Sequence, residues 1–118
     1  MPPTDNTVIG RRIPDDQWFF WQAEGKIQPG DYGKVSDDPP TSSRWTWFVK
    51  APDGVVFQLA SPQRPDAAGR HHEVEEHEDG TITVEPRPGN SNSILSPCGW
   101  HGYIHRGVWS GPSASTAS

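Results

Sequence analysis

The residues best suited to chemistry lie in one stretch of the chain, residues 90–109. It contains Ser93, His101 and the only cysteine, Cys98. A serine hydroxyl becomes an effective nucleophile when an imidazole accepts its proton. The run Ser-Pro-Cys-Gly between Ser93 and His101 predicts a turn, and residues that flank a hairpin turn become neighbours across two strands. The stretch therefore predicts a Ser93–His101 pair of nucleophile and general base, with Gly99 or its neighbours offering backbone N–H groups to an oxyanion.

Two other interpretations of this stretch stay open. Cys98 is a second candidate nucleophile, although most free cysteines are small buried residues. Cys98 and His101 also form a Cys-x-x-His pair, a spacing found among zinc ligands. A second pair is missing, since His71 and His72 are adjacent and would point to opposite faces of a strand, while His105 would lie about 13 Å from His101 along a strand. We therefore expect no metal and no cofactor, and keep a small zinc-binding protein as an alternative.

Composition narrows the class of protein. The 118 residues suffice for one domain but not for two ordinary ones. A net charge of −5 without a basic cluster argues against a nucleic-acid partner. No apolar run approaches the ~20 residues of a membrane span, and the N-terminus lacks the apolar core of a signal peptide. We therefore expect a cytoplasmic protein with neither nucleic acid nor membrane as its partner, and the oligomeric state stays open.

The elements that must position the chemistry are expected to be short strands. The clearest hairpin joins residues 44–50 to residues 55–59 through the turn-forming run Pro52-Asp53-Gly54. Further strands are expected at residues 17–22 (with a helix as the alternative), 80–85, 93–95, 100–105 and 108–109, and residues 71–79 are expected to form an edge strand or loop. The sequence thus predicts a mostly β chain, a single small antiparallel β-sandwich or partly open barrel with long polar loops.

The two ends of the chain are poor in core residues. We therefore expect a flexible N-terminal tail over residues 1–12, a single β-rich domain over residues 13–110, and a flexible C-terminal tail over residues 111–118. The core is expected to hold the large apolar residues of the strand runs, each worth roughly 1.5–3 kcal/mol when buried. These residues are Trp45, Trp47, Phe57, Ile82, Val84, Ile94 and Ile104.

The order of motifs in residues 70–109 resembles a known family. His72 precedes a charged segment, and then come Thr81-Ile82-Thr83-Val84, Ser93-Ile94-Leu95, Cys98 with His101, Tyr103-Ile104 and Gly107. This order resembles the BubE-like serine peptidases of bacterial ubiquitination-like operons and phages, small proteins that process a ubiquitin-like partner. The resemblance covers about a third of the chain. It departs from the family pattern where Asn92, rather than proline, precedes the serine, and where Gly99-Trp100 separates Cys98 from His101.

The resemblance implies a role for each matching residue. Ser93 would be the nucleophile, His101 the general base and His72 an ancillary residue of the site. The substrate would be the C-terminal tail of a ubiquitin-like protein or of another protein. The alternative from a different class is a non-catalytic phage or bacterial binding or accessory module, which would use exposed Trp and Tyr side chains as an aromatic interaction surface.

Overall fold

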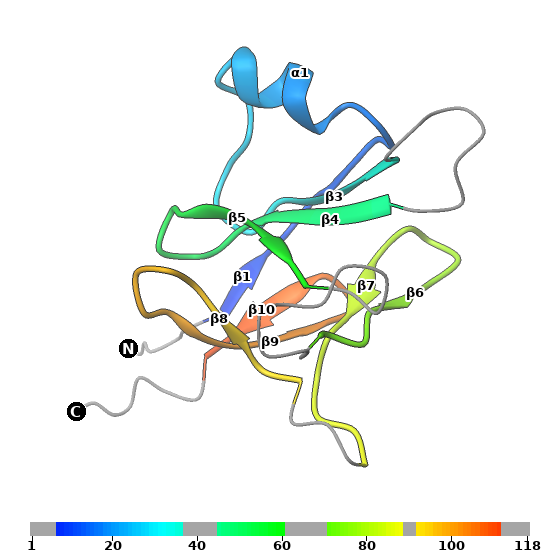
Figure 1. The fold of residues 1–118 in the computed structure, drawn as a ribbon, viewed down its shortest axis with the longest axis vertical. Helices are drawn as coiled ribbons and strands as arrows, with labels where there is room; N and C mark the ends of the chain where they lie inside the picture. Colours follow the sequence, from blue (N-terminus) through cyan, green and yellow to red (C-terminus); the bar gives the residue numbers. More distant parts are fainter. Residues whose placement is uncertain (1–6, 37–44, 61–70, 89–91, 112–118) are drawn as a thin grey trace.

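The computed structural model describes residues 7–36, 45–60, 71–88 and 92–111, and these form a mostly β fold (Figure 1). One sheet has the order β2-β3-β4-β5. Its strands are β2 (Arg12–Ile13), β3 (Tyr32–Ser36), β4 (Trp45–Lys50) and β5 (Val56–Leu59). The β4–β5 hairpin and its Pro52-Asp53-Gly54 turn confirm the strongest strand prediction. Strands β2 and β3 run parallel, which the expected antiparallel sandwich did not include.

The second sheet has the order β1-β10-β9-β8 and is antiparallel throughout. Its strands are β1 (Thr7–Ile9), β8 (Ile94–Leu95), β9 (His101–His105) and β10 (Val108–Ser110). A small ribbon of β6 (Glu75–Glu76) and β7 (Ile82–Thr83) joins this sheet, because Val84 forms a bridge with Ile104 of β9. The strands predicted around residues 80–85, 93–95, 100–105 and 108–109 are therefore confirmed, the first three with shorter bounds and the last extended to Ser110.

The two sheets enclose the main core. It consists of Tyr32, Trp47, Val49, Ala51, Leu59, Ile82, Val84, Ile94, Ile104 and Trp109, and Trp45 and Phe57 pack against it partly buried. Most of the predicted core residues are thus buried as expected. Because the core lies between two sheets and the described strands form no closed barrel, the architecture is a small β-sandwich.

A short helix, α1 (Trp18–Ala23), replaces the strand predicted over residues 17–22. Figure 1 shows it covering the face of the β3–β4 pair opposite the main core. Trp18 is buried with Ile13 and Ile27 in a second core cluster, and Trp21 packs against this cluster. The two phenylalanines between the tryptophans are exposed. Gly25, at φ +72°, ends the helix, since its N–H bonds to the Gln22 carbonyl and the next N–H bonds to Trp21. These two hydrogen bonds form a Schellman motif, which commonly ends a helix at a glycine.

The predicted N-terminal tail is too long. Residues 7–12 contain β1, which pairs with β10, and the first residue of β2. Val8 lies opposite Trp109 and packs, partly buried, against the main core. Residues 1–6 and 112–118 lie outside the described part of the chain. Within the described ranges, no helix has the length and apolar character needed to cross a membrane.

Candidate functional site

The β8–β9 hairpin carries Ser93 and His101 on one face. The register places Ile94 opposite Gly102 and Leu95 opposite His101. Ile94 is fully buried, whereas Leu95 is 64% exposed and His101 is exposed. Ser93 directly precedes β8 and is half-buried. Extending the register by one residue puts Ser93 on the outer face with Leu95, as the diagonal neighbour of His101. Diagonal residues have Cα atoms about 7–8 Å apart, within reach of a long or aromatic side chain.

The hydroxyl and the imidazole share this face without touching. Among the residues that the structure describes, no hydrogen bond joins the Ser93 hydroxyl to His101. The His101 ring instead lies beside Tyr103, with 6.3 Å between the ring centroids. Because His101 is exposed, a change of its side-chain rotamer can reorient the ring across the face. The hairpin therefore brings together the predicted nucleophile and base but leaves the contact between them open.

His72 approaches Ser93 from the other side. Its Nε2 lies 3.0 Å from the Ser93 carbonyl oxygen, which can only accept, so Nε2 carries the proton and donates it. The Ser96 N–H bonds to the Trp100 carbonyl, so by alternation the backbone groups of Ser93 and Leu95 point away from β9. His72 occupies that outer edge of β8. The predicted ancillary residue therefore contacts the backbone carbonyl of Ser93, the predicted nucleophile, and not its hydroxyl.

The second ring nitrogen of His72 is unusual. Nδ1 is buried and has no hydrogen-bond partner among the described residues. With Nε2 protonated, Nδ1 of the neutral ring is a bare acceptor, and buried acceptors of this kind are rare. The backbone N–H of His72 bonds to the Ala60 carbonyl at the end of β5, which ties the histidine to the other sheet. His72 therefore spans both sheets at the position where it meets Ser93.

Asn92 organises the backbone around Ser93. It is 3% exposed and has a φ of +54°, a left-handed conformation that asparagine tolerates better than most residues. Its side-chain oxygen accepts the Glu73 N–H, and its nitrogen donates to the carbonyls of Glu73 and Glu85. The sequence marked Asn92 only as a departure from proline. In the structure, it fixes the segment that carries His72 beside the residue that precedes Ser93.

The turn of the hairpin corrects two expectations. The N–H of Gly99 bonds to the Ser96 carbonyl, and the N–H groups of Cys98 and Trp100 bond to the Ser96 hydroxyl. These donors are therefore engaged in the turn and do not face an oxyanion. Cys98 is exposed, in contrast to the usual buried free cysteine. By the same alternation, the Leu95 N–H points away from β9, toward the outer edge of β8.

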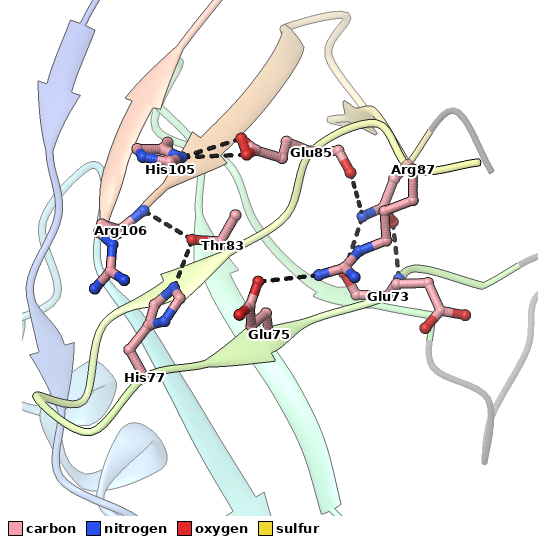
Figure 2. Close-up of polar contacts among 9 residues, drawn as sticks. Glu73, Glu75, His77, Thr83, Glu85, Arg87, His105 and Arg106 are labelled. Atoms are coloured by element: carbon pink, nitrogen blue, oxygen red, sulfur yellow. Dashed lines mark hydrogen bonds and ion pairs between the residues drawn. The ribbon is translucent and has the colours of Figure 1, made fainter.

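The other histidines take part in separate polar contacts. Figure 2 shows His77 against the Thr83 hydroxyl at 2.6 Å, and that hydroxyl also accepts the Arg106 N–H. His105 Nδ1 lies 3.0 Å from the Glu85 carboxylate (Figure 2). His71 pairs with Glu73. In the described segments, no three His, Cys, Asp or Glu side chains are grouped to hold a metal ion. The expectation of no zinc stays a prediction.

Two cations of one sheet bind a carboxylate of the β6–β7 ribbon, at the edge of the sandwich. The Glu76 carboxylate accepts hydrogen bonds from Arg12 at 2.9 Å and from Lys34 at 3.1 Å. Partial burial would raise the pKa of Glu76, but the two cations outweigh burial and hold this pKa below its ordinary value. Lys34 and Arg12 also lie over the rings of Trp45 and Trp47. These contacts stabilise the sandwich at a distance from the β8–β9 turn.

A separate apolar surface lies on α1. Phe19 is 53% exposed and Phe20 is 64% exposed, and Phe19 meets the Phe48 ring edge-on with 5.0 Å between centroids. The tryptophans of the described segments are buried or partly buried. The exposed aromatic side chains of α1 are therefore phenylalanines rather than the Trp and Tyr that the sequence suggested.

Comparisons of the chain with protein-family models, with curated proteins and with solved structures find no match.

Proposed function

We propose that this protein is a small serine peptidase-like hydrolase with its site on the outer face of the β8–β9 hairpin. Ser93 is the nucleophile, His101 the general base, and His72 a residue that positions Ser93. The observation that carries the proposal is the convergence of these three residues. Ser93 and His101 share one exposed face by strand register, and His72 donates to the carbonyl of Ser93 itself.

The chemistry follows from these positions. The Ser93 hydroxyl attacks an acyl carbon while a His101 nitrogen takes its proton, which gives a tetrahedral oxyanion. The Leu95 N–H is the proposed donor to that oxyanion. When the intermediate collapses, the imidazolium of His101 returns the proton to the leaving amine, and an ester to Ser93 remains. Water, deprotonated by His101, then releases the carboxylic acid and restores the serine.

The proposed substrate is an extended protein tail, such as the C-terminal tail of a ubiquitin-like protein. This part rests on the family resemblance of residues 70–109. Two features of the site suit an extended chain. The face is open rather than enclosed, and Leu95 presents an exposed apolar side chain beside Ser93 on the same face. An apolar residue of the tail can pack on Leu95 while the scissile bond lies over Ser93.

A serine-directed fluorophosphonate probe tests the proposal. Mass spectrometry of the labelled protein is expected to place the label on Ser93, and both Ser93→Ala and His101→Ala are expected to abolish it. His105→Ala is the matched control, since His105 lies on the same face of β9 four residues away and pairs with Glu85 instead. Equal loss of label in the two histidine variants, or no label on Ser93 in the unaltered protein, would contradict the proposal.

The exposed phenylalanines of α1 support a second candidate function, a binding module for an apolar segment of another protein. Large aromatic side chains dominate the energetics of many interfaces. Selection of peptides from a displayed library should enrich sequences with apolar anchors, and Phe20→Ser should weaken their binding at least about tenfold, as for an interface hot spot. The candidate fails if the enriched peptides bind Phe20→Ser as tightly as the unaltered protein.

A further inference from the structure

The tips of two hairpins from different sheets are tied together. The β4–β5 turn contributes Asp53 and the β8–β9 turn contributes Ser96, and the Ser96 hydroxyl donates to the Asp53 carboxylate at 2.5 Å. Figure 1 shows the two turns projecting side by side at the same end of the sandwich. The two residues are 43 positions apart in sequence. We refer to this contact as the Asp53–Ser96 latch.

The turn of β8–β9 depends on the Ser96 hydroxyl. This oxygen accepts the N–H of Cys98 at 3.2 Å and the N–H of Trp100 at 3.0 Å. Ser96 is 3% exposed, so water does not readily replace these partners. A hydroxyl has two lone pairs and one proton. Both lone pairs serve the turn, so the proton needs an acceptor from elsewhere, and Asp53 supplies it.

Asp53 is itself held in place. One of its carboxylate oxygens accepts the Val55 N–H at 3.2 Å, within the β4–β5 turn, and the other receives the Ser96 proton. That turn is closed by a bond from the Gly54 N–H to the Ala51 carbonyl. A hydroxyl-to-carboxylate bond of this length belongs to the strong, charge-assisted kind. The rigid β4–β5 hairpin therefore sets the orientation of the Ser96 hydroxyl.

The latch lies between the two residues of the proposed site. Ser93 is three residues before Ser96, and His101 directly follows Trp100, whose N–H bonds to the Ser96 hydroxyl. We infer that Asp53 is a positioning residue for the Ser93–His101 pair, acting through Ser96. Without the Asp53 carboxylate, the Ser96 hydroxyl proton loses its acceptor. The O–H bond can then rotate toward the turn, where it interferes with the hydrogen bonds that the oxygen accepts from the two N–H groups. This inference rests on the function proposed above.

The experiment compares Asp53→Ala and Asp53→Asn with the unaltered protein. In Asp53→Ala, amide hydrogen exchange at Cys98 and Trp100 should be about tenfold faster, as expected for the loss of one charge-assisted bond. The maximal rate of probe labelling at Ser93 should fall by about the same factor, with the probe concentration at half-maximal rate unchanged, because geometry and not binding is altered. Asp53→Asn should recover most of both losses, since its amide oxygen can accept the Ser96 proton. Glu24→Ala, an exposed carboxylate beyond α1, is the control and should change neither.

The outcomes separate the inference from the function it rests on. Faster exchange with an unchanged labelling rate would overturn the positioning role and leave the latch as a purely structural contact. Unchanged exchange at Cys98 and Trp100 would overturn the latch. An unaltered protein that never labels at Ser93 would overturn the proposed hydrolase, whatever the exchange of the variants shows. If Asp53→Ala does not fold, Ser96→Ala takes its place, because it removes the hydroxyl that links the two turns. Slower labelling together with faster exchange in Ser96→Ala supports the inference, and full labelling combined with faster exchange overturns it.

Discussion

The β4–β5 and β8–β9 hairpins have the same topology but opposite relations to their surroundings. Strand β4 is covered on both faces, with Trp47 and Val49 in the main core and Phe48 against α1. Strand β9 is covered on one face, where Ile104 is fully buried, and its other face presents His101 and His105 to solvent. The comparison shows which hairpin supplies stability and which one has a face free for chemistry.

The latch between the two turns joins these roles. A hairpin that is packed on one face only has fewer contacts to define its position, and β8 contributes only Ile94–Leu95 to the ladder. The β4–β5 hairpin can hold the β8–β9 turn in position through the hydrogen bond between Asp53 and Ser96. In this arrangement the open face of β8–β9 carries Ser93 and His101. The distance between these two residues depends on Asp53, which belongs to the other hairpin.

The largest expected difference between the hairpins is in stability. Trp47→Ala in β4 should lower the free energy of unfolding by about 4 kcal/mol, as is usual for loss of a buried aromatic side chain. Leu95→Ala in β8 should change it by less than about 0.5 kcal/mol, since Leu95 is 64% exposed. Urea unfolding followed by tryptophan fluorescence for Leu95→Ala and by circular dichroism for Trp47→Ala measures both. Equal losses would mean that the outer face of β8–β9 is covered and would break the comparison.

Asn92 offers the next largest effect, at the edge of the open hairpin. Asn92→Ala should cost about 2–3 kcal/mol, because three hydrogen bonds to partly buried backbone groups of Glu73 and Glu85 are lost. It should also abolish probe labelling of Ser93, since the segment that carries His72 would no longer be fixed. Asn92→Gly, which keeps the left-handed backbone, should lose nearly as much stability. A stable Asn92→Gly would assign the role of Asn92 to its φ angle rather than to its hydrogen bonds.

The sequence predicted the hairpins correctly where a turn is formed by residues that are neighbours in the chain. The β4–β5 hairpin followed from Pro52-Asp53-Gly54 between two alternating runs. The strands expected at residues 100–105 and 108–109 left only Arg106-Gly107 to connect them. The latter pair has φ angles of +46° and +81°, the conformation of a two-residue hairpin turn. The strand predicted over residues 17–22 is a helix in the structure, since the four-residue apolar run at residues 18–21 fits either period. Which of the two forms depends on the sheet face that the segment covers.

The contacts that shape the candidate site could not be predicted, because each joins residues far apart in sequence. His72 meets Ser93 across 21 positions, and Asp53 meets Ser96 across 43. Nothing local to Asn92 indicates that its side chain would bind two separate segments. The sequence could identify Ser93 and His101 as flanking one turn, but which face they share depends on a register that Ile94 fixes by entering the core.

A smaller effect is expected at the rim, between the covered and open regions. Glu76→Gln should lower the free energy of unfolding at pH 7 by about 1 kcal/mol or less, because the 36% exposed carboxylate is partly screened by water. The folded-state pKa of Glu76 lies below the ordinary value of 4.5, so its contribution is present above pH 4.5 and is lost as the pH falls through the lower, folded value. Unfolding of both proteins from pH 7 to pH 3 should therefore show a difference that shrinks toward zero. A difference that stays constant would show that charge does not mediate the contact.

The smallest effect is expected from Cys98, at the tip of the open hairpin. Its side chain is exposed, and its contribution to the turn is made by its backbone N–H, which alanine retains. Cys98→Ala should therefore change the free energy of unfolding by no more than about 0.5 kcal/mol, as for surface substitutions in general. It should also leave the rate of probe labelling at Ser93 unchanged, because the proton passes between Ser93 and His101 without the thiol. Since Cys98 lies in the turn of the hairpin that follows Ser93, this variant separates the two candidate nucleophiles directly. If hydrolysis of a tail substrate were lost in Cys98→Ala and kept in Ser93→Ala, the nucleophile would be the thiol, and the open face would serve to bind the substrate rather than to attack it.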